Sequence, residues 1–255
     1  MITPEQLAPA SAPMTMVLLH GAWHDGSAWT ETRKHLEAWG HTVHTPTIPG
    51  HGPGADMSTT VRQMVDGVVQ YIVGNNLTDI VLVGHSGAGI ILTQAAPRLL
   101  DRLHRMVFID AYILEDGNSV YDESPPEMQA LIDALCDADG GFMIPFPVWR
   151  ESMIQDASQD VANACYARLN REPKTIVHTK LDQKAFYRIV AEQAVRLTYA
   201  HLMSDFVIPI GEYNWWPRYP SRLPGARILR VPGSHELMFS EPRDMAGLIV
   251  RGARD

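Results

Sequence analysis

The sequence predicts an α/β fold in which a mostly parallel, doubly wound sheet is covered by helices on both faces. Short buried-strand patterns at 16–19, 80–83 and 105–109 alternate with segments whose apolar residues recur at helical spacing. Strands that alternate with helices are typical of parallel sheets, because a parallel connection needs a crossover long enough to hold a helix. The length of 255 residues suits one large domain, or one domain with an insertion.

The first half of the chain predicts strands and helices in turn. These elements are a strand at 16–19, a helix at 32–39, a strand at 42–46, a helix at 58–73, a strand at 80–83, a helix at 90–100 and a strand at 105–109. The helix at 90–100 is expected to end near Pro97, because proline removes a backbone donor and clashes inside a helix.

The alternation stops after Asp110 and resumes near residue 196. Residues 115–195 have a mostly helical pattern interrupted by prolines, which predicts a helical lid inserted after the strand that ends near Asp110. The expected core comprises residues 15–114 and 196–255, with further strands at 196–202 and 226–231 and a last helix at about 245–251. Such a lid would stand over the carboxyl ends of the strands, where open α/β sheets bind ligands.

Composition excludes several classes of partner. The formal net charge of −8 argues against nucleic acid and against anionic membrane surfaces. No stretch approaches the roughly 18 apolar residues of a membrane span. Residues 1–14 lack a basic start and an apolar run, so we expect a flexible lead-in rather than a signal peptide. Cys136 and Cys165 give neither a disulfide framework nor metal spacing, which favours a cytoplasmic setting.

The most informative stretch is the apolar run 80–83 followed by Gly84-His85-Ser86-Gly87. This pattern predicts a buried strand that turns sharply into a helix, with one hydroxyl at the turn. Such an elbow lifts the serine Oγ out of the sheet and directs the N–H groups of the helix toward whatever Oγ attacks. Ser86 is therefore the candidate nucleophile.

A serine nucleophile needs a base to take its proton and an acid to orient that base. His235 follows the last predicted strand, and Asp205 follows the strand before it, so both belong to loops at the edge of the sheet that carries the elbow. The order along the chain is Ser86, Asp205, His235. Asp110, at the end of the strand after the elbow, is the alternative acid.

Four stretches carry a resemblance to a known family: HGAWHDGSAW at 20–29, GHSGAG at 84–89, Asp205, and GSHELMFSEP at 233–242. The sequence resembles the α/β-hydrolase superfamily, and within it the branch of plant methylesterases, hydroxynitrile lyases and their bacterial esterase relatives. The resemblance implies the α/β-hydrolase fold. It also implies that Ser86 is the nucleophile, His235 the general base and then acid, and Asp205 the orienting carboxylate.

The oxyanion hole is expected to consist of two backbone N–H groups, those of Gly87 and Ala22. Gly87 follows the nucleophile, and Ala22 lies in the small, flexible loop after the first strand. Each such donor stabilises the transition state by roughly 3 kcal/mol. Trp23 is expected to line the wall of the pocket.

The chain departs from the family patterns at three positions. Ala88 stands where the Gly-x-Ser-x-Gly pattern has its last glycine, a change small enough to preserve close packing. Gly21 and Glu236 stand where the similar lyases have threonine and lysine. Without that hydroxyl and that cation, hydrolysis is favoured over cyanohydrin cleavage.

Other polar residues of these motifs have simpler interpretations. His85 points to the opposite side of the elbow and is expected to be a packed neighbour rather than the base. His20 and His24, taken with His41 and His44, match no metal-ligand spacing, so no metal is predicted. The glycines around Ser86 lack the lysine of a phosphate loop and dinucleotide spacing, which excludes a nucleotide and leaves no expected cofactor.

The insertion contains an apolar stretch at 142–153, from which Phe146 and Trp149 are candidates for the substrate pocket, as is Trp215 after the acid strand. The sequence thus predicts a serine hydrolase that cleaves a small apolar or aromatic carboxylic ester, as a monomer or homodimer. One alternative is a lyase or cofactor-free dioxygenase that uses His235 and Asp205 as the base. Another is a non-catalytic receptor for a small ligand.

Overall fold

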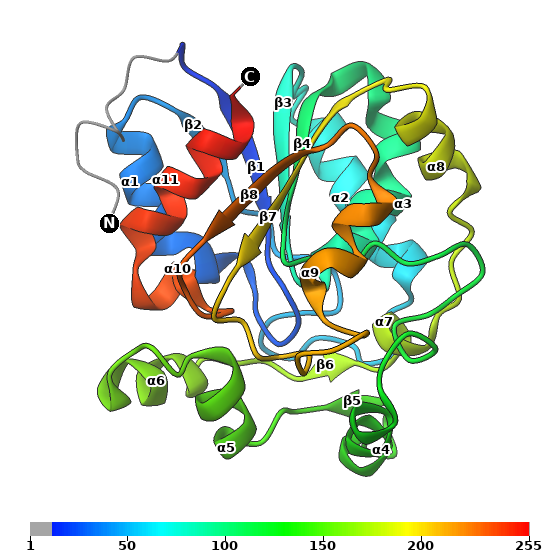
Figure 1. Ribbon diagram of the computed structural model, residues 1–255, viewed down its shortest axis with the longest axis vertical. Coiled ribbons are helices and arrows are strands. Elements are labelled where there is room, and N and C mark those ends of the chain that lie inside the picture. The colour runs from blue at the N-terminus through cyan, green and yellow to red at the C-terminus, as the bar shows by residue number, and fades with distance from the viewer. Residues whose placement is uncertain (1–11, 255) are drawn as a thin grey trace.

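The computed structural model describes residues 12–254, whose centre is a six-stranded sheet (Figure 1). The strand order is β2-β1-β3-β4-β7-β8, and each neighbouring pair is parallel. The strands are β1 (Thr15–Leu19), β2 (Thr42–His44), β3 (Ile80–His85), β4 (Leu103–Ile109), β7 (Arg196–Leu202) and β8 (Arg227–Val231). The predicted α/β fold class is confirmed. The expected lead-in at 1–14 lies outside the described residues as far as residue 11.

Helices cover both faces of the sheet, as Figure 1 shows. One face carries α1 (Thr30–Ala38) and α11 (Pro242–Ala253), and the other carries α2 (Val61–Gly74), α3 (Ala88–Leu99) and α8 (Lys184–Ala191). In β3, Ile80 and Leu82 join the core on the α2–α3 side, while Val81 and Val83 join the core on the α11 side. Because both faces are buried, successive side chains of the strand are all apolar.

Helix α3 begins directly after the elbow and ends at Leu99, so it runs past Pro97. A proline in the last turn removes one hydrogen bond, that to the carbonyl of Thr93, and ends the helix soon afterwards. The predicted end near Pro97 is therefore correct to within one turn.

The insertion, residues 115–195, is made of short elements. These are α4 (Pro126–Leu135), β5 (Gly141–Phe142), α5 (Phe146–Val148), the π-helical turn η3 (Trp149–Met153), α6 (Gln159–Tyr166), β6 (Glu172–Pro173), α7 (Thr175–His178) and α8. Two of its prolines mark the starts of helices, since Pro126 is the first residue of α4 and Pro145 precedes α5, whereas Pro173 lies in β6. In Figure 1 the elements from α4 to α6 form a layer beyond the carboxyl ends of the strands, whereas α8 packs against α3.

The remaining elements are short and lie in loops. They are η1 (Gly26–Trp29), η2 (Leu100–Arg102), α9 (Trp215–Arg218), η4 (Pro220–Arg222) and α10 (Leu237–Ser240). No helix among residues 12–254 is long and apolar enough to cross a membrane.

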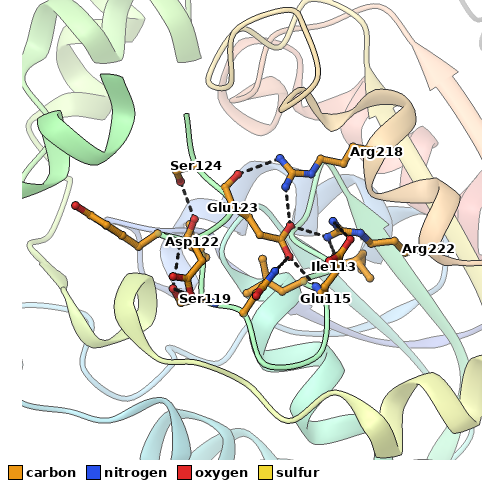
Figure 2. Close-up of polar contacts among 12 residues, drawn as sticks. Ile113, Glu115, Ser119, Asp122, Glu123, Ser124, Arg218 and Arg222 are labelled. Carbon is orange, nitrogen blue, oxygen red and sulfur yellow. Dashed lines mark hydrogen bonds and ion pairs between the residues drawn. The ribbon is translucent and has the colours of Figure 1, made fainter. Parts of the chain in front are cut away.

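A buried carboxylate fastens the start of the insertion to the α9–η4 region (Figure 2). Glu123 Oε2 lies 2.6 Å from Arg222 Nη1 and 3.2 Å from Arg218 Nη2, and its Oε1 accepts the N–H of Glu115 at 2.7 Å. The Glu123 side chain is 1% exposed. Arg222 also donates to the carbonyl of Ile113. The chain leaving β4 is thus held from both sides before α4 begins.

The glycine that permits close packing after the elbow is Gly89 rather than residue 88. A Cβ atom on Gly89 would lie 2.3 Å from the carbonyl oxygen and 2.7 Å from the nitrogen of Tyr112, both backbone atoms. Ala88 is buried in the core, so its methyl group is accommodated. The loop after β4 therefore lies directly against the start of α3.

We predict that Gly89→Ala lowers the free energy of unfolding by about 3 kcal/mol or more, since two backbone segments must separate. Gly74→Ala is the control, because nothing lies within 4 Å of a Cβ at that position. It should leave stability unchanged or raise it slightly. Urea unfolding followed by circular dichroism measures both, and equal stabilities of the two variants would contradict the prediction.

Candidate active site

Ser86 lies at the break between β3 and α3 and has a left-handed backbone with φ of 55°. This conformation is uncommon for a residue other than glycine. Its N–H donates to the Ile109 carbonyl at 3.2 Å, and its carbonyl accepts the N–H groups of Gly89 at 3.0 Å and Tyr112 at 3.2 Å. These bonds hold the strained turn, and Ser86 lines a cavity.

The loop after β1 lies directly against this elbow. A Cβ on Gly21 would come within 2.9 Å of the Ser86 Cβ, so the approach requires a glycine there. A Cβ on Gly87 would lie 3.5 Å from the backbone nitrogen of Ala22. Ala22 and Gly87 both line the cavity beside Ser86. Ala22 and Gly87, the two residues that the sequence proposed for the oxyanion hole, therefore lie close together beside Ser86.

His20 fixes the orientation of the peptide group between Gly21 and Ala22. Its Nε2 accepts the N–H of Ile48 at 3.0 Å, so the proton is on Nδ1, which donates to the Gly21 carbonyl at 2.9 Å. Burial, and then the charge of His51, keep the pKa of His20 well below its usual value, so the ring is neutral. In a trans peptide the N–H points opposite to the C=O, so the Ala22 N–H points away from His20.

His235 and Asp205 form a buried pair. Asp205 Oδ2 lies 2.5 Å from His235 Nδ1, and Oδ1 accepts the N–H of Val207 at 3.0 Å. The ring of His235 stacks on Trp215 at 5.8 Å and lies 4.3 Å from the ring of His85. Burial disfavours the charged imidazolium, but the Asp205 carboxylate outweighs it and raises the pKa of His235.

The other ring nitrogen of His235 is free to take a proton. His235 Nε2 is buried and has no hydrogen-bond partner among residues 12–254. Ser86 and His235 are thus not hydrogen-bonded to each other in this structure. Burial also opposes ionisation of Asp205, yet His235 lowers the pKa of that carboxyl, which keeps it anionic. A histidine held in this way has the form of a general base.

Asp110, the alternative acid, has another partner. Its Oδ1 and Oδ2 lie 2.9 and 3.3 Å from His201 Nδ1, and Oδ2 accepts the N–H of Leu202 at 2.8 Å. Burial, together with the charge of the nearby Asp205, raises the pKa of Asp110 well above its usual value. Asp110 therefore belongs to a second buried histidine–carboxyl pair that adjoins Asp205.

The cavity beside Ser86 has a volume of about 280 Å³ and is mostly apolar. The elbow and the insertion both contribute side chains to its wall. Among these are Ile90, Leu131, Ile132, Phe142, Ile176 and Val177. A site of this kind favours an apolar ligand with one polar group near the serine.

Trp23 is the one predicted aromatic residue that lines this cavity. Trp149 is fully buried against His24, and Phe146 packs on Tyr166, in a separate core within the insertion. Trp215 lies behind His235. From the same apolar stretch, Phe142, Ile144 and Val148 line the cavity instead. The pattern of this stretch predicts burial but not which face of its short helical turns meets the cavity.

Four polar residues that line the cavity were not predicted from the sequence: Tyr112, Glu127, Ser152 and Glu172. Tyr112 follows Asp110 at the carboxyl end of β4, a position where the general rule for α/β sheets could have indicated it. Glu172 lies in β6 of the insertion, and no sequence pattern marks it. No group of three His, Cys, Asp or Glu side chains within the described range is placed to hold a metal ion.

Glu236, next to His235, pairs with His24. Its two carboxylate oxygens lie 3.0 and 3.1 Å from His24 Nε2. Burial opposes the charge of Glu236, but His24 outweighs it and lowers the pKa of Glu236 to about 2. Glu236 is fully buried and does not line the cavity. The residue at this position therefore joins two loops beneath the site.

The comparisons with known proteins agree with this fold. The profile of the alpha/beta hydrolase family matches residues 16–248, so the chain belongs to that family. A solved extracellular α/β-hydrolase from a Paenibacillus species, described as sharing structural and functional homology with tobacco salicylic acid binding protein 2, is 36% identical. Its TM-score is 0.91, and the match covers 95% of this chain and 100% of that one.

Two curated relatives match over most of their length. The carbendazim hydrolyzing esterase of Nocardioides sp. (strain SG-4G) is 27% identical over 242 residues, which cover 90% of this chain and 96% of that protein. Methylesterase 17 of Arabidopsis thaliana is 23% identical over 264 residues, covering 97% of this chain and 94% of that protein. The resemblance to the methylesterase branch, predicted from the motifs, is confirmed.

We predict that Glu236→Gln lowers the free energy of unfolding at pH 7 by about 3 kcal/mol, because the folded state loses a buried carboxylate whose ionised form it stabilises. The pKa of Glu236 is depressed in the folded state, so its ionisation stabilises the fold above its ordinary value of 4.5 and this contribution is lost as the pH falls toward 2. Urea unfolding at pH 7 and pH 3 should show that the difference in free energy of unfolding between wild type and variant is smaller at pH 3. A difference that does not change with pH would contradict this account.

Proposed function

We propose that this protein is a cofactor-independent serine hydrolase that cleaves a small apolar or aromatic carboxylic ester through an acyl-enzyme on Ser86. The observation that carries the proposal is the buried Asp205–His235 pair behind a strained elbow serine that opens on an apolar cavity. The relatives named as esterases support the same class of reaction.

In the proposed mechanism the Ser86 Oγ attacks the ester carbonyl while His235 Nε2 takes its proton. Asp205 stabilises the imidazolium that forms. The negative charge that develops on the carbonyl oxygen is bound by the N–H groups of Ala22 and Gly87. His235 then gives its proton to the leaving alcohol, and the acyl group stays on Ser86. Water, deprotonated by the same histidine, releases the carboxylic acid and restores the serine.

The cavity supports an apolar acyl or aryl group as the main part of the substrate. At about 280 Å³ it suits a small molecule, and its wall is largely aliphatic and aromatic. We propose that the part of the insertion from α4 to α7 acts as the lid over this site. Action as a monomer or homodimer stays a prediction, as does a cytoplasmic location, since the similar Paenibacillus protein is described as extracellular.

A second candidate is base chemistry without an acyl-enzyme, of the lyase or cofactor-free dioxygenase type. The observation that favours it is that His235 Nε2 makes no hydrogen bond to Ser86, or to any other group that the structure describes. In that case His235 would take a proton directly from the substrate, and Ser86 would only help to bind it.

We predict that Ser86→Ala lowers kcat for a methyl or aryl ester by about 10³-fold or more, because the nucleophile is lost. Ser152→Ala is the matched control, since Ser152 also lines the cavity but donates its hydroxyl to the Val148 carbonyl. A fluorophosphonate should add mass to the peptide that contains Ser86 in the wild type. Full turnover in Ser86→Ala would refute the acyl-enzyme. Loss in His235→Ala with only weakening in Ser86→Ala would favour the second candidate.

The raised pKa of His235 predicts the pH dependence of the reaction. The base acts in its neutral form, so kcat/KM should rise with pH through a midpoint above the ordinary histidine value of 6.5. Asp205→Ala should move this midpoint to lower pH and reduce the rate, because Asp205 is the main group that raises the pKa. Stopped-flow or steady-state profiles from pH 5 to 9 measure both. A midpoint below 6.5 in the wild type would count against His235 as the base.

A further inference from the structure

Glu172 brings a carboxylate from the insertion to the loop that carries the Ala22 amide. Its Oε2 accepts the N–H of Trp23 at 2.7 Å. The Trp23 carbonyl in turn accepts the N–H of Asn170 at 2.6 Å. Trp23 has a left-handed backbone with φ of 62°, which is costly for a bulky residue. The contacts from residues 170–172 therefore hold a strained position directly after Ala22.

The carboxylate of Glu172 is itself paired with His51. His51 Nε2 lies 2.9 and 3.1 Å from the two oxygens of Glu172, and His51 Nδ1 lies 3.2 Å from the Ile48 carbonyl. Both ring nitrogens face oxygens that accept hydrogen bonds, so His51 satisfies them only as an imidazolium. The two side chains are 1% and 0% exposed. Burial disfavours that cation, yet the charge of Glu172 outweighs it and raises the pKa of His51.

The two peptide groups on either side of the Ala22 Cα are each fixed by a buried polar side chain. His20 donates to the Gly21 carbonyl, in the peptide group that contains the Ala22 N–H. Glu172 accepts the Trp23 N–H, in the next peptide group. The rings of His20 and His51 meet edge to face at 4.9 Å, so these two supports are in contact. Together they leave the Ala22 amide little freedom to rotate.

We propose that Glu172 and His51 are positioning residues that hold the Ala22 N–H in the direction needed to bind the oxyanion. This inference rests on the proposed function and deepens it, because it makes a residue of the insertion part of the support for the oxyanion hole. The packing of the insertion on the core and the correct orientation of the Ala22 N–H then depend on the same contacts. Neither side chain is required to touch the reacting atoms.

The test compares Glu172→Ala with a buried carboxylate elsewhere in the insertion. Glu172→Ala should lower kcat by about 30- to 100-fold with KM nearly unchanged, because a misdirected donor weakens the transition state more than the ground state. Glu172→Gln should stay within about threefold of wild type, since its amide oxygen can accept the Trp23 N–H and its nitrogen can donate to a neutral His51.

The matched control is Glu123→Ala. Glu123 also belongs to the insertion, is also buried, and also binds a backbone N–H and a cationic side chain, but it holds the segment next to Glu115 (Figure 2). It should leave kcat unchanged. An aryl trifluoromethyl ketone forms an adduct on Ser86 that carries an oxyanion. Its inhibition constant for the folded enzyme does not depend on the stability of the fold. This inhibition constant should rise in Glu172→Ala in parallel with the loss of kcat and stay constant in Glu123→Ala.

The outcomes separate this inference from the proposed function. If Ser86→Ala is inactive but folded Glu172→Ala keeps the kcat and inhibition constant of wild type, the positioning role is wrong and the hydrolase stands. The positioning role is also wrong if only KM changes. If wild type neither cleaves esters nor reacts with a fluorophosphonate, the proposed function fails and takes the inference with it. Where Glu172→Ala does not fold, His51→Gln serves, with an expected loss in kcat of about tenfold; an unchanged kcat there overturns the inference.

Discussion

The left-handed backbone at Ser86 is the constraint on which the rest of the site depends. A residue with a side chain adopts this conformation only where its surroundings hold it, and here three backbone hydrogen bonds from β4, α3 and the loop after β4 do so. The close approach at Gly89 follows from the same turn, because the loop after β4 must lie against the elbow to supply the bond from Tyr112. The loop after β1 also packs against the elbow, which requires the glycine at position 21. The six parallel strands bring the participating segments to one edge.

Buried polar pairs form a second level of organisation around the elbow. His24 with Glu236, His51 with Glu172, and His201 with Asp110 each join segments far apart in the sequence. Such pairs contribute little net stability compared with apolar packing, but breaking the His24–Glu236 or the His51–Glu172 pair leaves an uncompensated buried charge. The His201–Asp110 pair is neutral, because burial raises the pKa of Asp110 and lowers that of His201. They therefore disfavour other arrangements of the loops, in which the paired side chains would be apart. Two of them lie directly beside proposed catalytic residues: Glu236 follows His235 in the chain, and Asp110 adjoins Asp205.

Local sequence patterns were sufficient to predict the strands of the sheet and the turn at Ser86. The run Ile80–Val83 is apolar at every position because it is covered on both faces, and this pattern needs no tertiary information. The order of Ser86, Asp205 and His235 likewise follows from residues at the ends of predicted strands. The structure adds that Asp205 rather than Asp110 is the carboxylate bonded to His235. Spacing along the sequence alone could not decide which of these two acids, at the ends of neighbouring strands, pairs with His235.

The insertion was the part that the sequence could not predict in detail. Its helices are short, so the spacing of apolar residues indicates that they are buried but not which core or cavity they face. Phe146 and Trp149 pack in a separate core within the insertion. Glu172 had no local signal, because its partners Trp23 and His51 are 149 and 121 residues away in the sequence. Long-range polar contacts of this kind depend on how the insertion docks, which composition and periodicity do not encode.

The contacts of the insertion with the loop at 234–236 have a consequence for protein engineering. Asp156 accepts both the N–H and the hydroxyl of Ser234, and the Met153 carbonyl accepts the N–H of Glu236, so the insertion braces the chain on both sides of His235. A chimera that exchanged the whole insertion to change the range of substrates would remove this brace. Single replacements at Leu131 or Ile132 in α4, which line the cavity with side chains that carry no polar atoms, would reshape the binding site and leave the brace intact.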